Sequence, residues 1–121
     1  MKITVTEKNG VTILSLRAER FDAHNSEIVK EQIKDLYAAG AKKVLVDLGE
    51  VRFIDSSGLG ALVSGFKSAV SNRGRLTLSG LQSQVESMFE LTRLNRVFDI
   101  FPTAEEALSS FVEQLGRRTA P

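Results

Sequence analysis

The chain has 121 residues, 42% of them hydrophobic and 26% charged, and this size and composition are typical of one globular domain. Sixteen Lys and Arg residues against fifteen Asp and Glu residues leave a formal net charge of +1. Without a basic excess, we expect no mainly electrostatic attachment to nucleic acid or to an anionic membrane. Cysteine is absent and His24 is the only histidine, which excludes disulfides, thiolate nucleophiles and the usual multi-histidine metal sites. We therefore expect no resident metal or cofactor.

The sequence shows no targeting or membrane segment. Residues 1–8 alternate polar and apolar side chains and lack the apolar stretch of a secretory signal. The uninterrupted apolar runs are far shorter than the roughly 20 residues that a membrane helix needs. Together with the absence of cysteine, these features lead us to expect a cytoplasmic protein without membrane insertion.

The first half of the chain predicts a hairpin, a helix and a buried strand. Residues 3–6 and 11–16 are largely β-branched runs, and the Asn9-Gly10 pair between them is a strong hairpin signal. A helix capped by Asn25 or Ser26 and ended by Gly40 is predicted from helical spacing of its apolar residues, Val29, Ile33, Leu36 and Tyr37. Residues 44–48 form a short apolar run, which is typical of a strand covered on both faces.

The second half predicts three more helices separated by strands. A helix closed by Gly74 follows residues 55–58, with an apolar stripe of Leu59, Leu62, Val63, Phe66 and Val70. Residues 75–79 read as a strand, and a second short strand is expected around Val97-Phe98. Capping boxes predict helix starts at Ser83 and Thr103. The inner faces of these two helices are expected to be Val85, Met88 and Phe89, and then Leu108, Phe111, Val112 and Leu115.

The predicted order of elements is β-β-α-β-α-β-α-(β)-α. A hairpin followed by alternating strands and helices implies an α/β fold with a mixed sheet of four to five strands and about four helices packed against it. We expect a single domain over residues 1–116 and a flexible tail over residues 117–121.

The segment Asp55-Ser56-Ser57-Gly58-Leu59-Gly60 carries the chemical information. It leads from a strand into a helix, whose first turn offers free backbone N–H groups and the positive end of the helix dipole. A serine here acts as a helix cap, as a phosphate-binding hydroxyl or as a phosphate acceptor. Local physics favours a cap, supplied by a serine or by the aspartate, because caps are the most common of the three roles. Two hydroxyls directly after an acid are more than one cap requires.

With the preceding runs 44–48 and 51–54, this motif resembles the core signature of the STAS domain. More narrowly, the chain is similar to the bacterial anti-sigma factor antagonists, from the hairpin through Phe21-Asp22 to the helix start at Thr103. Two positions depart from the family pattern. Residues 17–22 lack the glycine that usually precedes the aspartate, and Asn25 replaces a common threonine.

The resemblance implies a phosphorylation switch without intrinsic catalysis. Ser56 would be phosphorylated by a partner that is both serine kinase and anti-sigma factor. The unphosphorylated protein would bind that partner and release a sigma factor, phosphorylation would abolish binding, and a PP2C-type serine phosphatase would reset the switch. The partner-binding surface is expected to comprise Asp22, Asp55, Ser57, Gly58, Leu59 and Gly60. The protein itself is expected to be a monomer or weak dimer.

Three alternatives remain open from the residues. A serine hydrolase would need Ser56 or Ser57 activated by His24, but the Gly-x-Ser-x-Gly elbow is absent. Nucleotide binding at Gly58-Leu59-Gly60 would lack the Gly-Lys-Ser/Thr element of a P-loop. The nearest alternative is the same domain used in another signalling scaffold or as a partner of a transport system.

Overall fold

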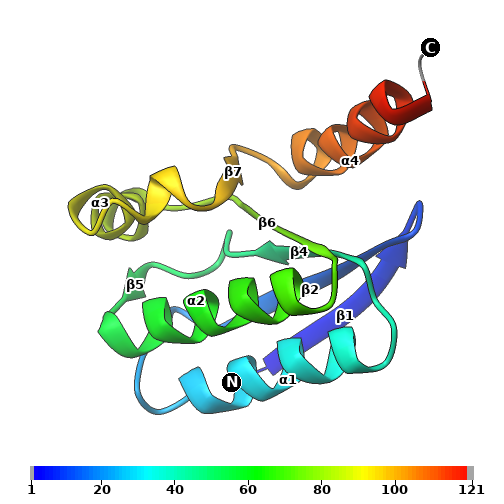
Figure 1. The fold of residues 1–121 in the computed structure, drawn as a ribbon. Helices are drawn as coiled ribbons and strands as arrows, with labels where there is room; N and C mark the ends of the chain where they lie inside the picture. The colour runs from blue at the N-terminus through cyan, green and yellow to red at the C-terminus, as the bar shows by residue number, and fades with distance from the viewer. Residues whose placement is uncertain (1, 120–121) are drawn as a thin grey trace.

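The computed structural model describes the backbone of residues 2–119 and the side chains of residues 2–112. Strands and helices alternate along most of this range (Figure 1). The strands are β1 (Lys2–Lys8), β2 (Val11–Arg17), β3 (Arg20–Phe21), β4 (Lys43–Asp47), β5 (Phe53–Ile54), β6 (Arg75–Ser79) and β7 (Asp99–Phe101). The helices are α1 (Ser26–Ala38), α2 (Ser56–Ser71), α3 (Ser83–Leu91), the 3₁₀ turn η1 (Leu94–Arg96) and α4 (Ala104–Thr119).

A five-stranded sheet in the order β1-β2-β4-β6-β7 forms the centre of the fold. The β1–β2 pair is antiparallel and the other pairs are parallel, so the predicted mixed sheet is confirmed. Helices α1 and α2 lie side by side on one face of the sheet, and α4 packs against β4, β6 and β7 from the other (Figure 1). A separate two-stranded parallel pair, β3–β5, was not predicted.

The predicted hairpin and the two-sided strand are both confirmed. Asn9 and Gly10 have φ values of 55° and 80°, as the tight turn between β1 and β2 requires. In β4, Val44 and Val46 belong to the core beneath α1 and α2, whereas Leu45 belongs to the smaller cluster beneath α4. Alternate side chains therefore anchor helices on opposite faces of the same strand.

Helix α1 begins and ends where predicted, but Asn25 does not cap it through its side chain. Gly40 takes a φ of 108° after the last turn, and the N–H of Ala41 donates to the carbonyl of Leu36, as in a glycine-terminated helix. Asn25 occupies the cap position, yet its side chain makes no capping hydrogen bond. Its carboxamide instead binds the N–H of Asp22 and the carbonyl of Arg20, so it closes the preceding loop.

In the last third, one helix start is confirmed and one strand boundary differs. Helix α3 begins at Ser83 as predicted, but the capping box does not form, since the cap residue is Gln82 and it makes no side-chain capping bond. The last strand covers Asp99–Phe101 rather than Val97-Phe98. The 3₁₀ turn η1 and its cap residue Val97 come directly before, and the side chain of Phe98 packs in the core.

Helix α4 begins where the capping box predicts. The Thr103 hydroxyl accepts a hydrogen bond from the N–H of Glu106 at 3.2 Å. Val112, expected on the inner face, is 59% exposed, and Val70 of α2 is 62% exposed, so both apolar stripes are narrower than predicted. The side chain of Leu115 lies outside the described residues. The helix continues through Thr119, and the proposed tail boundary at residue 117 remains a prediction.

Candidate functional site

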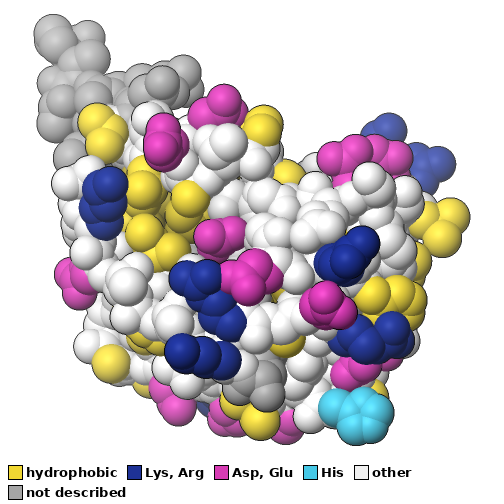
Figure 2. All heavy atoms as spheres, turned by 180° about the vertical axis from the view of Figure 1, so that it is seen from behind, with side chains coloured by type: hydrophobic (Ala, Val, Ile, Leu, Met, Phe, Trp, Pro, Cys, Tyr) yellow, Lys and Arg dark blue, Asp and Glu magenta, His cyan; other side chains and the backbone are white. Residues whose placement is uncertain are grey.

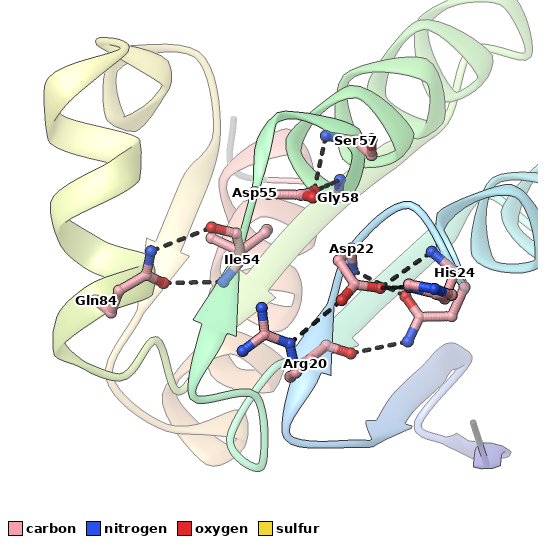
Figure 3. Close-up of polar contacts among 9 residues, drawn as sticks. Arg20, Asp22, His24, Ile54, Asp55, Ser57, Gly58 and Gln84 are labelled. Carbon is pink, nitrogen blue, oxygen red and sulfur yellow. Dashed lines mark hydrogen bonds and ion pairs between the residues drawn. The ribbon is translucent and has the colours of Figure 1, made fainter.

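The parallel pair β3–β5 brings two acidic residues to the same end of two neighbouring strands. Arg20 pairs with Phe53 and Phe21 with Ile54. The residue that follows each strand is an aspartate, Asp22 after β3 and Asp55 after β5. The predicted docking loop and the serine motif are therefore adjacent, although 33 positions separate the two aspartates along the chain (55 − 22 = 33). Figure 3 shows both carboxylates beside the start of α2.

Asp55 is the cap of helix α2. Its Oδ1 accepts hydrogen bonds from the N–H groups of Ser57, at 2.9 Å, and Gly58, at 3.1 Å (Figure 3). The cap that local physics favoured is thus present, and the aspartate supplies it. Ser56 is the first helical residue and is exposed, while Ser57 is half-buried. The serine expected as phosphoacceptor is the more accessible of the two.

The first turn of α2 rests directly on β3. A β-carbon at Gly58 would lie 2.5 Å from the carbonyl oxygen of Phe21 and 2.7 Å from the Ile54 side chain, so only glycine fits there. Gly58 is buried and Leu59 is 5% exposed. These two residues were expected to contact a partner, but their burial places them beneath the surface as supports. Gly60 is exposed and its surroundings are open.

Asp22 is held by its own loop. Its Oδ1 accepts a hydrogen bond from the backbone N–H of His24 at 3.0 Å, and its Oδ2 lies 3.3 Å from Nε of Arg20. Only 14% of its side chain is exposed. The His24 N–H, ahead of the Arg20 and His24 side chains, lowers the pKa of Asp22 below its usual 3.8. Asp22 therefore remains an anion near neutral pH. Its carboxylate both fixes the conformation of the loop and gives the loop a negative charge.

Arg20 also belongs to the site, although the sequence did not predict a functional role for it. Its guanidinium lies 4.1 Å from the centre of the Phe53 ring, a cation–π arrangement across the two strands. The arginine thus links the Asp22 loop to the strand that precedes the serine motif. Arg20 stands in the region where the family usually has a glycine, and that departure was the only signal for it.

A shallow groove of about 270 Å³ runs between the first turns of α1 and α2. Its walls are polar or small, and they comprise Ser26, Glu27, Lys30, Ser57, Gly60, Ala61 and Ser64. Lys30 lies 4.0 Å from Glu27, so the positive charge there is partly balanced. Ser57 therefore faces this groove, whereas Ser56 does not line it.

The geometry does not assemble a catalytic triad. His24 is 94% exposed and its Nδ1 lies 3.4 Å from Asp22. Among the described residues, no hydrogen bond joins His24 to Ser56 or Ser57. Within the same part of the chain, no group of three or more His, Asp and Glu residues is arranged to hold a metal ion.

Charge on the surface is mixed rather than segregated. Figure 2 shows Lys and Arg side chains interspersed with Asp and Glu side chains over one face of the molecule. The ion pairs Arg17–Glu50 and Arg75–Asp99 balance several of these charges locally. No helix in the described part of the chain has both the length and the apolar character to cross a membrane.

The STAS domain profile matches residues 2–107. The chain is 31% identical over 100 residues to the anti-sigma-B factor antagonist of Listeria monocytogenes, covering 83% of this chain and 88% of the relative. It is 28% identical over 106 residues to the anti-sigma-B factor antagonist of Bacillus subtilis, covering 87% of this chain and 96% of the relative. A putative anti-sigma factor antagonist from Thermotoga maritima has a similar crystal structure, with a TM-score of 0.81 and 28% identity. The superposition covers 89% of this chain and 92% of that protein.

The fold alone is shared more widely. A sulfate transporter family protein from Wolinella succinogenes superposes with a TM-score of 0.76 at 19% identity, covering 87% of each chain. Fold similarity at that level does not separate signalling from transport. The sequence relatives, which are named anti-sigma factor antagonists, do. On the family profile and these relatives, the chain belongs to the STAS domain family and, within it, to the bacterial anti-sigma factor antagonists.

Proposed function

We propose that this protein is a cytoplasmic anti-sigma factor antagonist whose partner binding is switched by phosphorylation of Ser56. The unphosphorylated form binds an anti-sigma factor with serine kinase activity and so releases a sigma factor. The phosphorylated form dissociates, and a PP2C-type serine phosphatase restores it. The protein contributes a docking surface and a phosphoacceptor, and the catalysis belongs to its partners.

One observation carries this proposal: Asp55 caps α2, and the exposed Ser56 hydroxyl forms no hydrogen bond with the side chains and backbone that the structure describes. Asp55 satisfies the N–H groups of Ser57 and Gly58 through one oxygen. Because Asp55 already supplies the cap, the start of helix α2 does not depend on the Ser56 hydroxyl. As the first helical residue, Ser56 can gain and lose a phosphate while the helix start stays intact.

The position of Ser56 also supports a switch in which a phosphate weakens binding. Phosphorylation adds about −1.5 to −2 charges at one point. The positive end of the α2 dipole tolerates this anion, so the fold remains in place. A partner surface complementary to a neutral serine beside Asp22 and Asp55 then meets added negative charge and a larger group. Each 1.4 kcal/mol of lost interaction weakens binding about tenfold.

The proposed docking surface is made of the exposed and half-buried residues around the start of α2. Ser56, Ser57 and Gly60 come from the helix itself, and Asp22 and Asp55 come from the ends of β3 and β5. Gly58 and Leu59 support this surface from below. The use of the same fold as a scaffold or transport module is the alternative, and it does not require Ser56 to be modified.

Phosphopeptide mass spectrometry on the protein isolated from its native cells tests the proposal. We expect a phosphate on the peptide containing Ser56 and Ser57, assigned to Ser56 by fragmentation and removed by a PP2C-type phosphatase. Ser57→Ala should retain the phosphate and Ser56→Ala should lose it. Absence of the modification under every growth condition sampled would favour the scaffold or transport alternative.

A further inference from the structure

Strand β5 has hydrogen-bonding groups on both edges, and β3 satisfies only one edge. The N–H of Phe53 donates to the carbonyl of Glu19 at 3.0 Å, and the N–H of Asp55 donates to the carbonyl of Phe21 at 3.3 Å. Because successive backbone groups point in opposite directions along a strand, the N–H and C=O of Ile54 face away from β3. Ile54 is fully buried, so neither group reaches water.

The side chain of Gln84 fills the place of a missing strand. Its Oε1 accepts a hydrogen bond from the N–H of Ile54 at 2.9 Å, and its Nε2 donates to the Ile54 carbonyl at 3.1 Å (Figure 3). One carboxamide thus satisfies both orphan groups of a buried residue. Gln84 comes from the first turns of α3, 30 positions further along the chain.

Ile54 directly precedes the residue that caps α2. Its backbone therefore sets the direction from which Asp55 enters the cap, and Ser56 follows immediately. On the other edge, the Asp55 N–H is fixed by Phe21. The orientation of the Ser56 segment is consequently determined by β3 on one side and by Gln84 on the other.

We propose that Gln84 is a positioning residue for the Ser56 switch, through which helix α3 and the phosphorylation segment are coupled. This inference rests on the proposed function of Ser56. Loss of the carboxamide leaves a buried N–H and a buried C=O without partners, which favours local opening of β5. The Asp55 cap then holds Ser56 less firmly, and the phosphate loses part of its placement at the helix N-terminus.

The chain offers a matched control. Gln82 also tethers α3, since its Nε2 donates to the carbonyl of Gly49 at 2.7 Å, but this contact lies in the loop before β5. Gln84→Met and Gln82→Met make the same chemical change and each removes one tether of α3. Only the first should act on Ile54 and on the cap.

Amide hydrogen exchange of the unphosphorylated protein, followed by NMR, tests the positioning step. We expect Gln84→Met to increase the exchange rates of Ile54, Ser57 and Gly58 by about tenfold or more, while strand β4 changes much less. Gln82→Met should leave these three amides near their original rates. Equal effects of the two variants, or a uniform rise over the whole chain, would overturn the inference, because either result describes general destabilisation.

Phosphoserine installed at position 56 during synthesis tests the coupling step. By ³¹P NMR, we follow the second phosphate pKa, which the α2 dipole lowers and the neighbouring carboxylates of Asp22 and Asp55 raise. Gln84→Met should raise this pKa, because the phosphate loses part of the stabilisation by the dipole, and Gln82→Met should not. An unchanged phosphate pKa in Gln84→Met would contradict the coupling. These measurements need no kinase, so absence of Ser56 phosphorylation in cells would overturn the proposed function separately.

Discussion

A β-carbon on Gly58 would lie 2.5 Å from the carbonyl oxygen of Phe21, which fixes how closely helix α2 approaches strand β3. The two residues belong to elements that the chain forms far apart in sequence. Their contact places the serine motif beside the Asp22 loop, and the candidate docking surface depends on this approach.

Gly58→Ala should destabilise the fold strongly, whereas Gly60→Ala should not. The added methyl group at position 58 meets backbone and a buried side chain, so we expect a loss of about 3 kcal/mol in the free energy of unfolding. At position 60 nothing lies within 4 Å of the added carbon, and the alanine should stabilise the helix by up to about 1 kcal/mol. Urea denaturation followed by circular dichroism measures both. Similar losses in the two variants would refute the close approach.

Substitutions at Asp55 separate its capping role from its charge. Asp55→Ala removes the acceptor for Ser57 and Gly58 and should cost about 1 kcal/mol of stability. Asp55→Asn keeps a capping oxygen, so we expect its stability to remain within a few tenths of a kcal/mol of the parent. The comparison is made by urea denaturation at neutral pH. A loss in Asp55→Asn as large as in Asp55→Ala would show that the charge, rather than the cap, stabilises α2.

The ionisation of Asp22 should make the site sensitive to acid. The pKa of Asp22 in the folded protein lies below its ordinary value, chiefly because of the His24 N–H. A lowered pKa contributes stability that is present above the unfolded value of about 3.9 and is lost as the pH falls through the folded value. We therefore expect Asp22→Asn to flatten the loss of stability between about pH 5 and pH 2.

The direct check is the carbon-13 shift of the Asp22 carboxyl carbon across this pH range. A titration midpoint below 3.8 agrees with the hydrogen bonds of the loop. A midpoint at or above that value would mean that the His24 and Arg20 contacts do not hold the carboxylate in solution.

The main sheet and its helices were predictable because their signals are local. Asn9-Gly10 indicates its turn, Gly40 indicates a helix end, and residues 44–48 indicate a strand buried on both faces. Each of these signals acts within a few residues. The cap at the start of α2 was predicted for the same reason. The local sequence does not distinguish a capping serine from a phosphate-binding or phosphate-accepting one.

The β3–β5 pair and the contacts of Gln84 were not predictable in this way. Two-residue strands are too short to show a period-2 pattern, and Arg20 and Phe53 become neighbours only when the chain folds. Gln84 looks like an ordinary helix residue in sequence, since nothing local marks its carboxamide as a substitute for a strand. Val70 and Val112 were predicted to be buried but are exposed, because helical spacing alone overestimates the width of the buried face of a helix.

The measurement that tests the account most directly is the affinity of the purified kinase partner for this protein with serine or phosphoserine at position 56. The partner is first captured from native cells with unphosphorylated protein, and calorimetry then compares the two forms. Phosphoserine at position 109, an exposed serine of α4 outside the docking surface, is the matched control. We predict that phosphoserine 56 raises the Kd by about a hundredfold, equivalent to about 2.8 kcal/mol, with the fold unchanged by circular dichroism. Equal Kd values for the serine and phosphoserine 56 forms would contradict the switch.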